Sequence, residues 1–531
     1  MTSNNTSLFP KINEIPEKFR LDKTVNQTKI LINGEFIEWK GPFQDVFSPI
    51  YIQSESSNSL EKFKIGSYPI ATNKESIRAL DAATKAFNGG KGEWPSMSVN
   101  DRIMAMENFI HKMESQREPI VKMIIWEICK SVKDAEKEFD RTVEYIKDTI
   151  IALKKIDKES SQIKTVSGVL AQVKKLPYGV VLCMGPYNYP LNETFATLIP
   201  ALLMGNTILF KPPRQGILLF SYLLDAFKEC FPQGVINTLY GRGRDVTPVL
   251  MQSGKIDVLA FIGSSKVANG MIKESPFANS LHAVLGLDAK NAGIIDETAN
   301  IDWAVNEVIQ GAFSFNGQRC TALKIIFVHS SIADNFNKKL CEEISKLSVG
   351  MPWDNNVFIT PVAEPEKPEY IQKCIDEAIA NGGEIINKES GGGIINYSLV
   401  NPAIIYPVNE KMNLLYNKEQ FGPILPIVPY YYPEEPIDYI IKSNTGQQVS
   451  IFSNNTENIS NFIKSLRCQV GRININSQCQ RGPDVFPFNG RKNSAKGTLS
   501  ITEALYALSI DSVIATKDND FNDKLISSIL K

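Results

Sequence analysis

Histidine is scarce in this chain: only three occur among its 531 residues, at His111, His282 and His329. His111 falls in a helical pattern and His329 follows a hydrophobic run, so we interpret both as packing or surface residues. A mechanism that needs a histidine base or several histidine metal ligands has few residues to draw on. The scarcity favours thiol chemistry over zinc chemistry.

Cysteine is also sparse, and neither sign of charge dominates. Eight cysteines occur without any Cys-x-x-Cys pair, which argues against a zinc site and against a disulfide framework. The chain has 57 basic and 58 acidic residues, a net charge of −1, and no long basic run. Bulk charge therefore gives no reason to expect a nucleic acid or a membrane as partner.

Long apolar runs are missing as well. None reaches the roughly 18 residues that a membrane helix needs, and the polar residues 1–7 do not resemble the apolar core of a signal peptide. Together with the few cysteines, these absences predict a cytoplasmic protein. The length exceeds what one hydrophobic core usually serves, so two or more domains are expected.

Strand and helix patterns alternate along much of the chain, which predicts doubly wound parallel sheets with ligand sites at the carboxyl ends of the strands. An N-terminal arm with little regular structure is expected up to about Lys29. The main predicted strands and hairpins are Ile30–Phe36, Ser160–Lys175, Gly179–Met184, Thr207–Lys211, Val235–Tyr240, Val258–Ile262, Lys324–His329 and Tyr506–Ile514. The main predicted helices are Asn73–Phe87, Asn100–Glu114, Glu118–Asp157, Gly216–Cys230, Val246–Gln252, Ile301–Phe313 and Ala333–Leu347.

The segment Phe313–Lys324 places Cys320 directly after Arg319, in a turn that contains Gly317. A thiolate is the reactive form of cysteine, and a neighbouring cation favours its formation. Arg319 could instead bind an anionic part of a substrate with its planar set of donors. Because free cysteines usually pack in cores, the motif alone leaves a catalytic and a structural cysteine both open.

The run Asn-Gly-Gln-Arg-Cys-Thr-Ala around Cys320 resembles the nucleophile segment of the aldehyde dehydrogenase superfamily. The Gln-Arg pair before the cysteine resembles its non-phosphorylating, NADP-dependent glyceraldehyde-3-phosphate dehydrogenase branch. The similarity extends from about Ile32 to about Lys517, and such collinearity is more specific than any single motif. Further segments match in the same order: Gly185–Pro190, Phe210–Pro213, Phe261–Ser265, Glu419–Pro423 and Gln480–Gly482.

The resemblance implies an α/β, aldehyde dehydrogenase-like fold: two doubly wound parallel-sheet domains plus a small β oligomerisation element. Residues 1–157 and 176–286 would form the cofactor-binding domain, and residues 287–491 the catalytic domain. Residues 158–175 and 492–531 would form the oligomerisation element and tail. A homo-oligomer, either a tetramer or a dimer, is expected.

The same resemblance implies two catalytic residues, Cys320 as nucleophile and Asn188 as oxyanion donor. It also implies one position for the base that activates water. Asn188 could also be a turn residue before Pro190. The family places a glutamate before Leu-Gly-Gly-Lys to activate water, but this chain has Gly286 there. Asp288 is the nearest acid and would share a face with position 286 if the segment is a strand. Two alternatives are equally open: deacylation is slow, or another group serves as its base.

The cofactor site is implied to follow the strand Thr207–Lys211. Where NAD-preferring members have a glutamate, this chain has Arg214, which can bind a 2′-phosphate and so predicts NADP over NAD; a solvated arginine is the alternative. The loop at Gly241 lacks the third glycine of the dinucleotide fingerprint, so by pattern it is weak evidence. The expected cofactor-binding residues are Lys211, Arg214, Gly243, Ser264, Glu419 and Phe421.

The resemblance implies that two or three arginines and a tyrosine hold the substrate's phosphate, and guanidinium donors match phosphate oxygens bidentately. By motif these are Arg141, Tyr189, Arg319 and Arg481. The resulting hypothesis is a metal-free, NADP-dependent oxidation of glyceraldehyde 3-phosphate through a thioester, without inorganic phosphate. One alternative is another aldehyde, with possible acyl transfer to coenzyme A. Another is a nucleotide-binding homologue with little catalysis.

Overall fold

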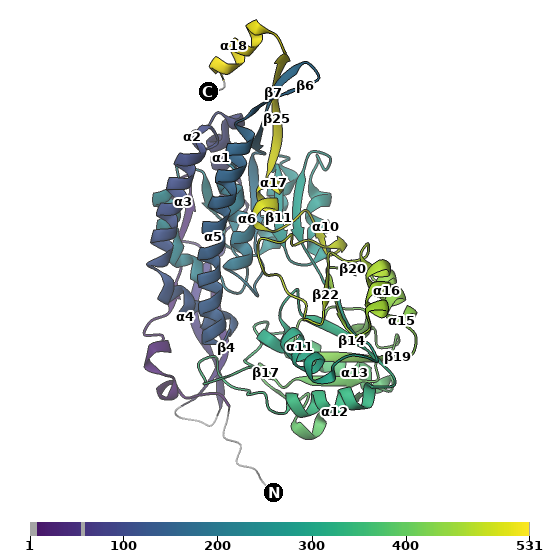
Figure 1. The fold of residues 1–531 in the computed structure, drawn as a ribbon. Coiled ribbons are helices and arrows are strands. Elements are labelled where there is room, and N and C mark those ends of the chain that lie inside the picture. Colours follow the sequence, from purple (N-terminus) through teal and green to yellow (C-terminus); the bar gives the residue numbers. More distant parts are fainter. Residues whose placement is uncertain (1–7, 55–58, 530–531) are drawn as a thin grey trace.

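A six-stranded sheet forms the centre of one lobe of the computed structural model, which describes residues 8–54 and 59–529 (Figure 1). Its order is β10-β9-β8-β11-β12-β24, with the first five strands parallel and β24 antiparallel to β12. The strands are β8 (Val180–Met184), β9 (Thr207–Lys211), β10 (Ile236–Thr238), β11 (Val258–Ile262), β12 (His282–Gly286) and β24 (Ala495–Lys496). All five residues of β8 and of β9 are buried, as expected for parallel strands covered on both faces.

Helices surround this sheet (Figure 1). The predicted helix at Asn73–Phe87 is confirmed as α1, with Thr72 and Glu75 forming a capping box. The long helical pattern at Glu118–Asp157 is divided in two, because Cys129 adopts a left-handed conformation with φ of 56°. The remaining main helices of this lobe are α3 (Val99–Glu114), α4 (Arg117–Ile128), α5 (Val132–Ser160), α6 (Asn192–Leu203), α7 (Leu224–Cys230), α9 (Pro248–Gln252) and α10 (Ser265–Glu274).

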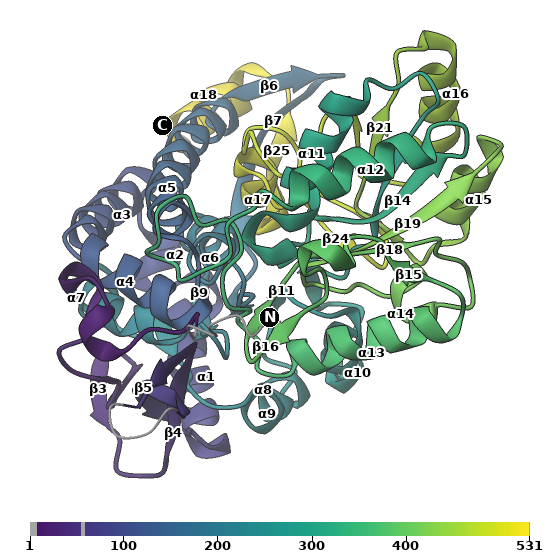
Figure 2. The ribbon, with the colours of Figure 1, turned by 90° about the horizontal axis from the view of Figure 1, so that it is seen from below.

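A seven-stranded sheet forms the second lobe, in the order β15-β18-β19-β14-β13-β21-β22 (Figure 2). Residues of β14 alternate between its two faces: Ile326 and Val328 pack with α11 and α12, whereas Ile325 and Phe327 pack with α15 and α16. Its strands are β13 (Asn291–Ile295), β14 (Leu323–His329), β15 (Glu384–Ile385), β18 (Ala403–Tyr406), β19 (Ile424–Tyr430), β21 (Gln448–Phe452) and β22 (Arg472–Ile475). Its main helices are α11 (Ile301–Phe313), α12 (Ala333–Ile344), α13 (Lys367–Ala380), α15 (Glu434–Lys442) and α16 (Thr456–Leu466). The predicted α/β class with two doubly wound parallel sheets is confirmed.

An antiparallel arm of β6 (Ile163–Val166), β7 (Val169–Pro177) and β25 (Ser509–Lys517) projects from the first lobe, followed by α18 (Asp520–Ile529) (Figure 1). The last strand begins later than the predicted Tyr506, because α17 (Ile501–Ala507) takes that part of the chain.

The N-terminal part is held on the first lobe. The predicted arm is described from Leu8 onward, and residues 1–7 lie outside the described part. Phe9 is fully buried and packs edge-on against the rings of Tyr51 and Tyr397. The predicted hairpin is present as β2 (Lys29–Ile32) and β3 (Glu35–Glu38). Across the described residues, the search for a helix with the length and apolar character to cross a membrane finds none.

Candidate active site

The turn that carries Cys320 is built from left-handed backbone. Phe315, Asn316 and Gly317 have φ of 50°, 56° and 68°, between the end of α11 and the start of β14. A Cβ atom on Gly317 would lie 2.6 Å from the Ala312 carbonyl oxygen, so glycine is needed there. Non-glycine residues in this conformation cluster at functional sites. In this turn Cys320 is half-buried.

The thiol of Cys320 lies among opposing charges. Burial raises its pKa to about 11, and the carboxylates of Glu193 and Glu419 act in the same direction. Lys324 and Arg481 oppose them. The thiol is therefore mostly protonated at neutral pH, so a reaction at this sulfur needs its proton to be removed during the attack on a substrate.

Lys324 is the buried cation that organises this turn. Its ammonium group donates to the carbonyl oxygens of Arg319 (2.6 Å) and Cys320 (3.1 Å) and pairs with Glu419 at 3.0 Å. The Asn291 side chain also donates to the Cys320 carbonyl, at 2.8 Å. The backbone of the nucleophile is thus fixed by two side-chain donors.

Asn188 lies beside the same turn. It is 4% exposed, and its Nδ2 donates to the Gln318 carbonyl at 2.8 Å. A side-chain amide has two N–H donors, so one stays available for an oxyanion near Cys320. The contact brings the predicted donor to the predicted nucleophile, and its catalytic role stays a prediction.

A cavity of about 830 Å³ contains three of the predicted cofactor residues: Lys211, Arg214 and Gly243. Burial lowers the pKa of Lys211 to about 8, and its Nζ donates to the Pro212 carbonyl at 2.8 Å. Arg214 is 70% exposed and lies 3.7 Å from Glu366, so its guanidinium is largely free to meet a ligand. The cavity is also lined by Lys62, Arg242 and Arg244. Two acids, Asp45 and Glu369, also line it, but the cations outnumber them, which fits a phosphorylated nucleotide.

Glu419 and Phe421, also predicted to bind cofactor, both contact the ammonium group of Lys324. Its ammonium group is 5.3 Å from the centroid of the Phe421 ring. Burial raises the pKa of Glu419, and Lys324 opposes that rise. These two predicted residues therefore belong to the same cluster as the carbonyl of Cys320.

Ser264 caps the N-terminus of α10, where its side chain accepts from the Val267 N–H. Asp288 lies at the same helix end: its Oδ2 accepts from the Ser265 N–H at 2.9 Å and from the Ser265 hydroxyl at 2.5 Å. Asp288 does not share a strand face with position 286 as predicted, because β12 ends at Gly286. Asp288 as base stays a prediction.

Gly286 is half-buried, with two apolar side chains beside its Cα. A Cβ atom there would lie 3.3 Å from Leu499 Cδ1 and 3.4 Å from Ile262 Cγ1. A longer side chain at this position would need both neighbours to move.

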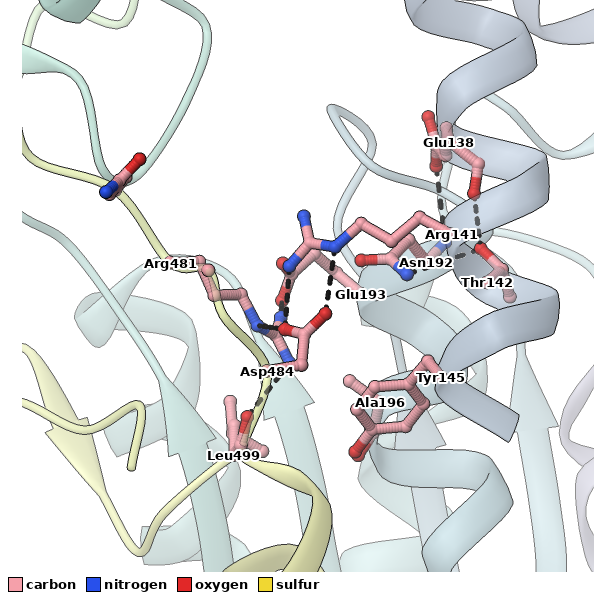
Figure 3. A network of polar contacts seen from close by, with 12 residues as sticks. Glu138, Arg141, Thr142, Tyr145, Asn192, Glu193, Ala196, Arg481, Asp484 and Leu499 are labelled. Carbon is pink, nitrogen blue, oxygen red and sulfur yellow. Dashed lines mark hydrogen bonds and ion pairs between the residues drawn. The ribbon is translucent and has the colours of Figure 1, made fainter. Parts of the chain in front are cut away.

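Two of the predicted phosphate-binding arginines meet at one carboxylate, as Figure 3 shows. Arg141 binds Asp484 through Nε (2.9 Å) and Nη2 (2.7 Å). Arg481 Nε lies 3.3 Å from Asp484 Oδ1, while its other nitrogens pair with Glu193 and donate to the Leu499 carbonyl at 2.9 Å. Arg481 is 7% exposed and its charge is paired internally with Glu193 and Asp484, whereas Arg141 keeps one nitrogen outside the bidentate pair.

Tyr189 and Arg319 complete the predicted set. Burial raises the pKa of Tyr189, and Arg319 and Arg141 oppose that rise, which indicates that the three residues are neighbours. Arg319 Nη2 donates to the carbonyls of Gln310 and Gly311 at the end of α11. Within the described part of the chain, the buried Arg319 Nε has no hydrogen-bond acceptor. It is therefore a donor that a substrate anion could satisfy.

Several charged residues of this region were not predicted from the sequence. Glu193 is the one acidic residue of α6, a helix whose residues are all buried. Because acids are rarely buried without a partner, an acid in such an apolar helix could have indicated a buried ion pair. Asp484 follows Arg481 by three residues, but nothing in the sequence shows that it also binds Arg141. The sequence predicts Lys324 only as the first residue of a strand.

Similarity to known proteins agrees with this geometry. A model of the aldehyde dehydrogenase family matches residues 52–511. The NADP-dependent glyceraldehyde-3-phosphate dehydrogenase of Streptococcus equinus is 32% identical over 488 residues, covering 91% of this chain and 97% of that protein. The crystal structure of NADP-dependent glyceraldehyde-3-phosphate dehydrogenase from Bacillus halodurans C-125, complexed with NADP, has a TM-score of 0.83 at 30% identity and covers 92% of this chain and 99% of its own.

A relative with another activity in its name also matches. The lactaldehyde dehydrogenase of Methanocaldococcus jannaschii is 28% identical over 494 residues, covering 92% of this chain and all of that protein. The family model spans most of the chain. The half-buried Cys320 of this chain lies in the turn that the buried Asn188 amide contacts. The predicted resemblance is confirmed, and the chain belongs to the aldehyde dehydrogenase family.

Proposed function

We propose that this protein is an NADP-dependent dehydrogenase that oxidises glyceraldehyde 3-phosphate to 3-phosphoglycerate through a thioester on Cys320, without inorganic phosphate. The observation that carries the proposal is the grouping of Cys320 and Asn188 at one turn, where the Asn188 amide donates to the Gln318 carbonyl. Relatives of about 30% identity that are named for this activity support it.

The chemistry follows from the residues at the turn. The thiol of Cys320 loses its proton to solvent water as the sulfur attacks the aldehyde carbon, and the resulting oxyanion receives hydrogen bonds from the free Asn188 N–H and the backbone. NADP, when bound, supplies the acceptor for the hydride. Lys211, Arg214 and Gly243 would hold it in the cavity that they line, and Arg214 would pair with a 2′-phosphate.

The substrate's phosphate would meet Arg141 and Arg319. Arg141 is 28% exposed and has one nitrogen outside its pair with Asp484. Arg319 offers an unsatisfied Nε inside the site. Tyr189 is a neighbour of both arginines, which act together on its pKa.

The wider predictions belong to the same proposal. Residues 1–157 and 176–286 would bind the cofactor, and residues 287–491 would carry catalysis. The protein would be a cytoplasmic homo-oligomer, a dimer or a tetramer, that associates through residues 158–175 and 492–531. The exposed apolar residues Val173, Val513 and Ile514 of the projecting arm support association there.

The test is NADPH formation from glyceraldehyde 3-phosphate and NADP in buffer without inorganic phosphate. Turnover by the wild type and its loss in Cys320→Ser are expected. Absence of NADPH with the wild type, or undiminished formation by Cys320→Ser, would refute the proposal.

A second candidate is oxidation of a small aldehyde that carries no phosphate. It is favoured by the internal pairing of Arg141 and Arg481 with Asp484 and Glu193, which balances two cations with two carboxylates. The same assay with lactaldehyde and glyceraldehyde separates the candidates: the substrate with the highest kcat/KM identifies the class. Supplying coenzyme A and measuring an acyl thioester tests transfer to a thiol.

A further inference from the structure

A buried ion pair contacts two segments of the candidate active site, and the reaction, as described so far, does not use it. The side chains of Lys130 and Glu138 are 1% and 0% exposed, and the Lys130 ammonium group lies 2.5 Å from Glu138 Oε2. Burying two charges is costly, and such a pair is often no more stabilising than apolar residues of similar volume. Stability alone therefore gives little reason for an ion pair at this place.

The ammonium group of Lys130 lies over two aromatic rings. It is 3.2 Å from the centroid of the Tyr189 ring and 4.7 Å from that of Phe315, and the two rings meet edge-on at 6.1 Å. Tyr189 follows Asn188, the predicted oxyanion donor. Phe315 belongs to the left-handed turn that leads to Cys320. A cation held away from water attracts a ring face more strongly than an exposed one, so Lys130 acts on both segments.

Glu138 fixes the start of α6. Its Oε1 accepts from the backbone N–H groups of Leu191 (3.1 Å) and Asn192 (3.2 Å), while its Oε2 binds Lys130 (Figure 3). Burial lowers the pKa of Lys130, and the Glu138 carboxylate opposes that shift, which favours the charged ammonium form. The Asn188 segment leads directly into this helix start, so the ion pair holds it through both the backbone and a ring.

The backbone next to Lys130 is bound to the nucleophile turn as well. Cys129 ends α4 in a left-handed conformation, and its carbonyl accepts from Thr360 Oγ1 at 2.7 Å. The Thr360 N–H donates in turn to Asn316 Oδ1 at 3.0 Å, and Asn316 follows Phe315 in the turn. The lysine and the turn therefore cannot shift against each other without loss of these hydrogen bonds.

We propose that Lys130 is a positioning residue that sets the Asn188 donor against the Cys320 turn; this rests on the proposed function. Its ammonium group, held by Glu138, attracts the ring of each segment. The contact that depends on this arrangement is the hydrogen bond from Asn188 Nδ2 to the Gln318 carbonyl, at 2.8 Å. Without the cation the two segments lose their common support, and the oxyanion donor moves relative to the sulfur.

The experiment separates positioning from stability with the double variant Lys130→Met and Glu138→Gln. Methionine has a similar volume without the charge, and the glutamine oxygen can still accept from the start of α6, so no buried charge is left unpaired. The midpoint of denaturant unfolding is expected to lie near the wild-type value and above that of either single variant. By contrast, kcat for NADPH formation is expected to stay about 10- to 100-fold below the wild type, because a misplacement of about 1 Å can cost about 100-fold. KM for NADP is expected to stay unchanged, since Lys130 is not among the residues that line the cofactor cavity.

Amide hydrogen exchange in residues 313–320 gives a readout that does not depend on activity. Exchange is expected to be faster in the double variant, because the turn loses the contact between its Phe315 ring and the cation. Arg102→Met is the matched control: Arg102 is another buried cation, and its Nε donates to the Leu203 carbonyl at 2.9 Å, at the opposite end of α6. This control is expected to lower the unfolding midpoint while kcat and the exchange of residues 313–320 stay at wild-type values.

If the double variant does not fold, or is no more stable than the single variants, Phe315→Leu takes its place, because it removes one ring and keeps the ion pair. Lower kcat and faster exchange are expected again, to a smaller degree.

Wild-type kcat, or unchanged exchange, in a folded double variant would overturn this assignment and leave the proposed function intact. An equal loss of kcat in Arg102→Met would do the same, since kcat would then only follow stability. A wild type that forms no NADPH from glyceraldehyde 3-phosphate, lactaldehyde or glyceraldehyde would refute the proposed function. The exchange measurement would still show whether Lys130 holds the turn.

Discussion

Replacing Asn188 with alanine removes a buried amide that serves two acceptors in this account. One N–H binds the Gln318 carbonyl at 2.8 Å, and the other is available to the oxyanion. Loss of one oxyanion donor costs about 2.7–4 kcal/mol of barrier, which lowers kcat about 100- to 1000-fold. Loss of the bond to Gln318 is a separate effect and lowers the free energy of unfolding by about 1–3 kcal/mol.

The two effects are measured separately, kcat from NADPH formation and stability from denaturant unfolding. Asn192→Ala is a matched control, because Asn192 is another buried amide, whose Nδ2 donates to Thr142 at 3.3 Å. It is expected to lower stability while kcat stays within about threefold of the wild type. If Asn188→Ala also loses stability but keeps kcat within about threefold, Asn188 only holds the turn, and its catalytic role is refuted.

Alkylation of Cys320 by iodoacetamide is expected to accelerate about tenfold per pH unit from pH 7 to 9, since its pKa is raised to about 11 and only the thiolate reacts; a plateau by pH 8 would contradict this. Arg141→Leu is expected to raise KM for glyceraldehyde 3-phosphate about 10- to 100-fold but not KM for glyceraldehyde; equal changes would refute phosphate binding. Arg214→Glu is expected to lower the ratio of kcat/KM for NADP over NAD at least about tenfold, and an unchanged ratio would place the 2′-phosphate elsewhere. The buried ammonium of Lys130 lies 2.5 Å from the Glu138 carboxylate, and Glu138→Gln removes that counter-ion. The free energy of unfolding, measured with denaturant, is expected to fall by about 3–5 kcal/mol. A loss below about 1 kcal/mol would contradict this.

The regular parts of the fold were predictable because their signals are local. Thr207–Lys211 and Val258–Ile262 are short apolar runs bounded by polar residues, and both form strands with the predicted bounds. The break between α4 and α5 was not predictable. Cys129 adopts a left-handed conformation there, and its carbonyl accepts from Thr360 Oγ1 of the other lobe at 2.7 Å. Such a contact depends on the assembled fold and leaves no mark in the neighbouring sequence.

The same distinction applies to the site. The motif around Cys320 and the approach of Asn188 could be expected from the sequence. The partners of the arginines could not, because Arg141 and Asp484 are 343 residues apart in the chain. Asp288 was predicted from an assumed strand, but the strand ends before it and a helix terminus binds its carboxylate.

The most direct test of the account is acid quenching of the protein during turnover with NADP and glyceraldehyde 3-phosphate, followed by mass spectrometry of its peptides. We expect a phosphoglyceroyl group on the peptide that contains Cys320, formed without inorganic phosphate and absent when NADP is omitted. Turnover without any acylated cysteine, or with the acyl group on another cysteine such as the exposed Cys468, would contradict it.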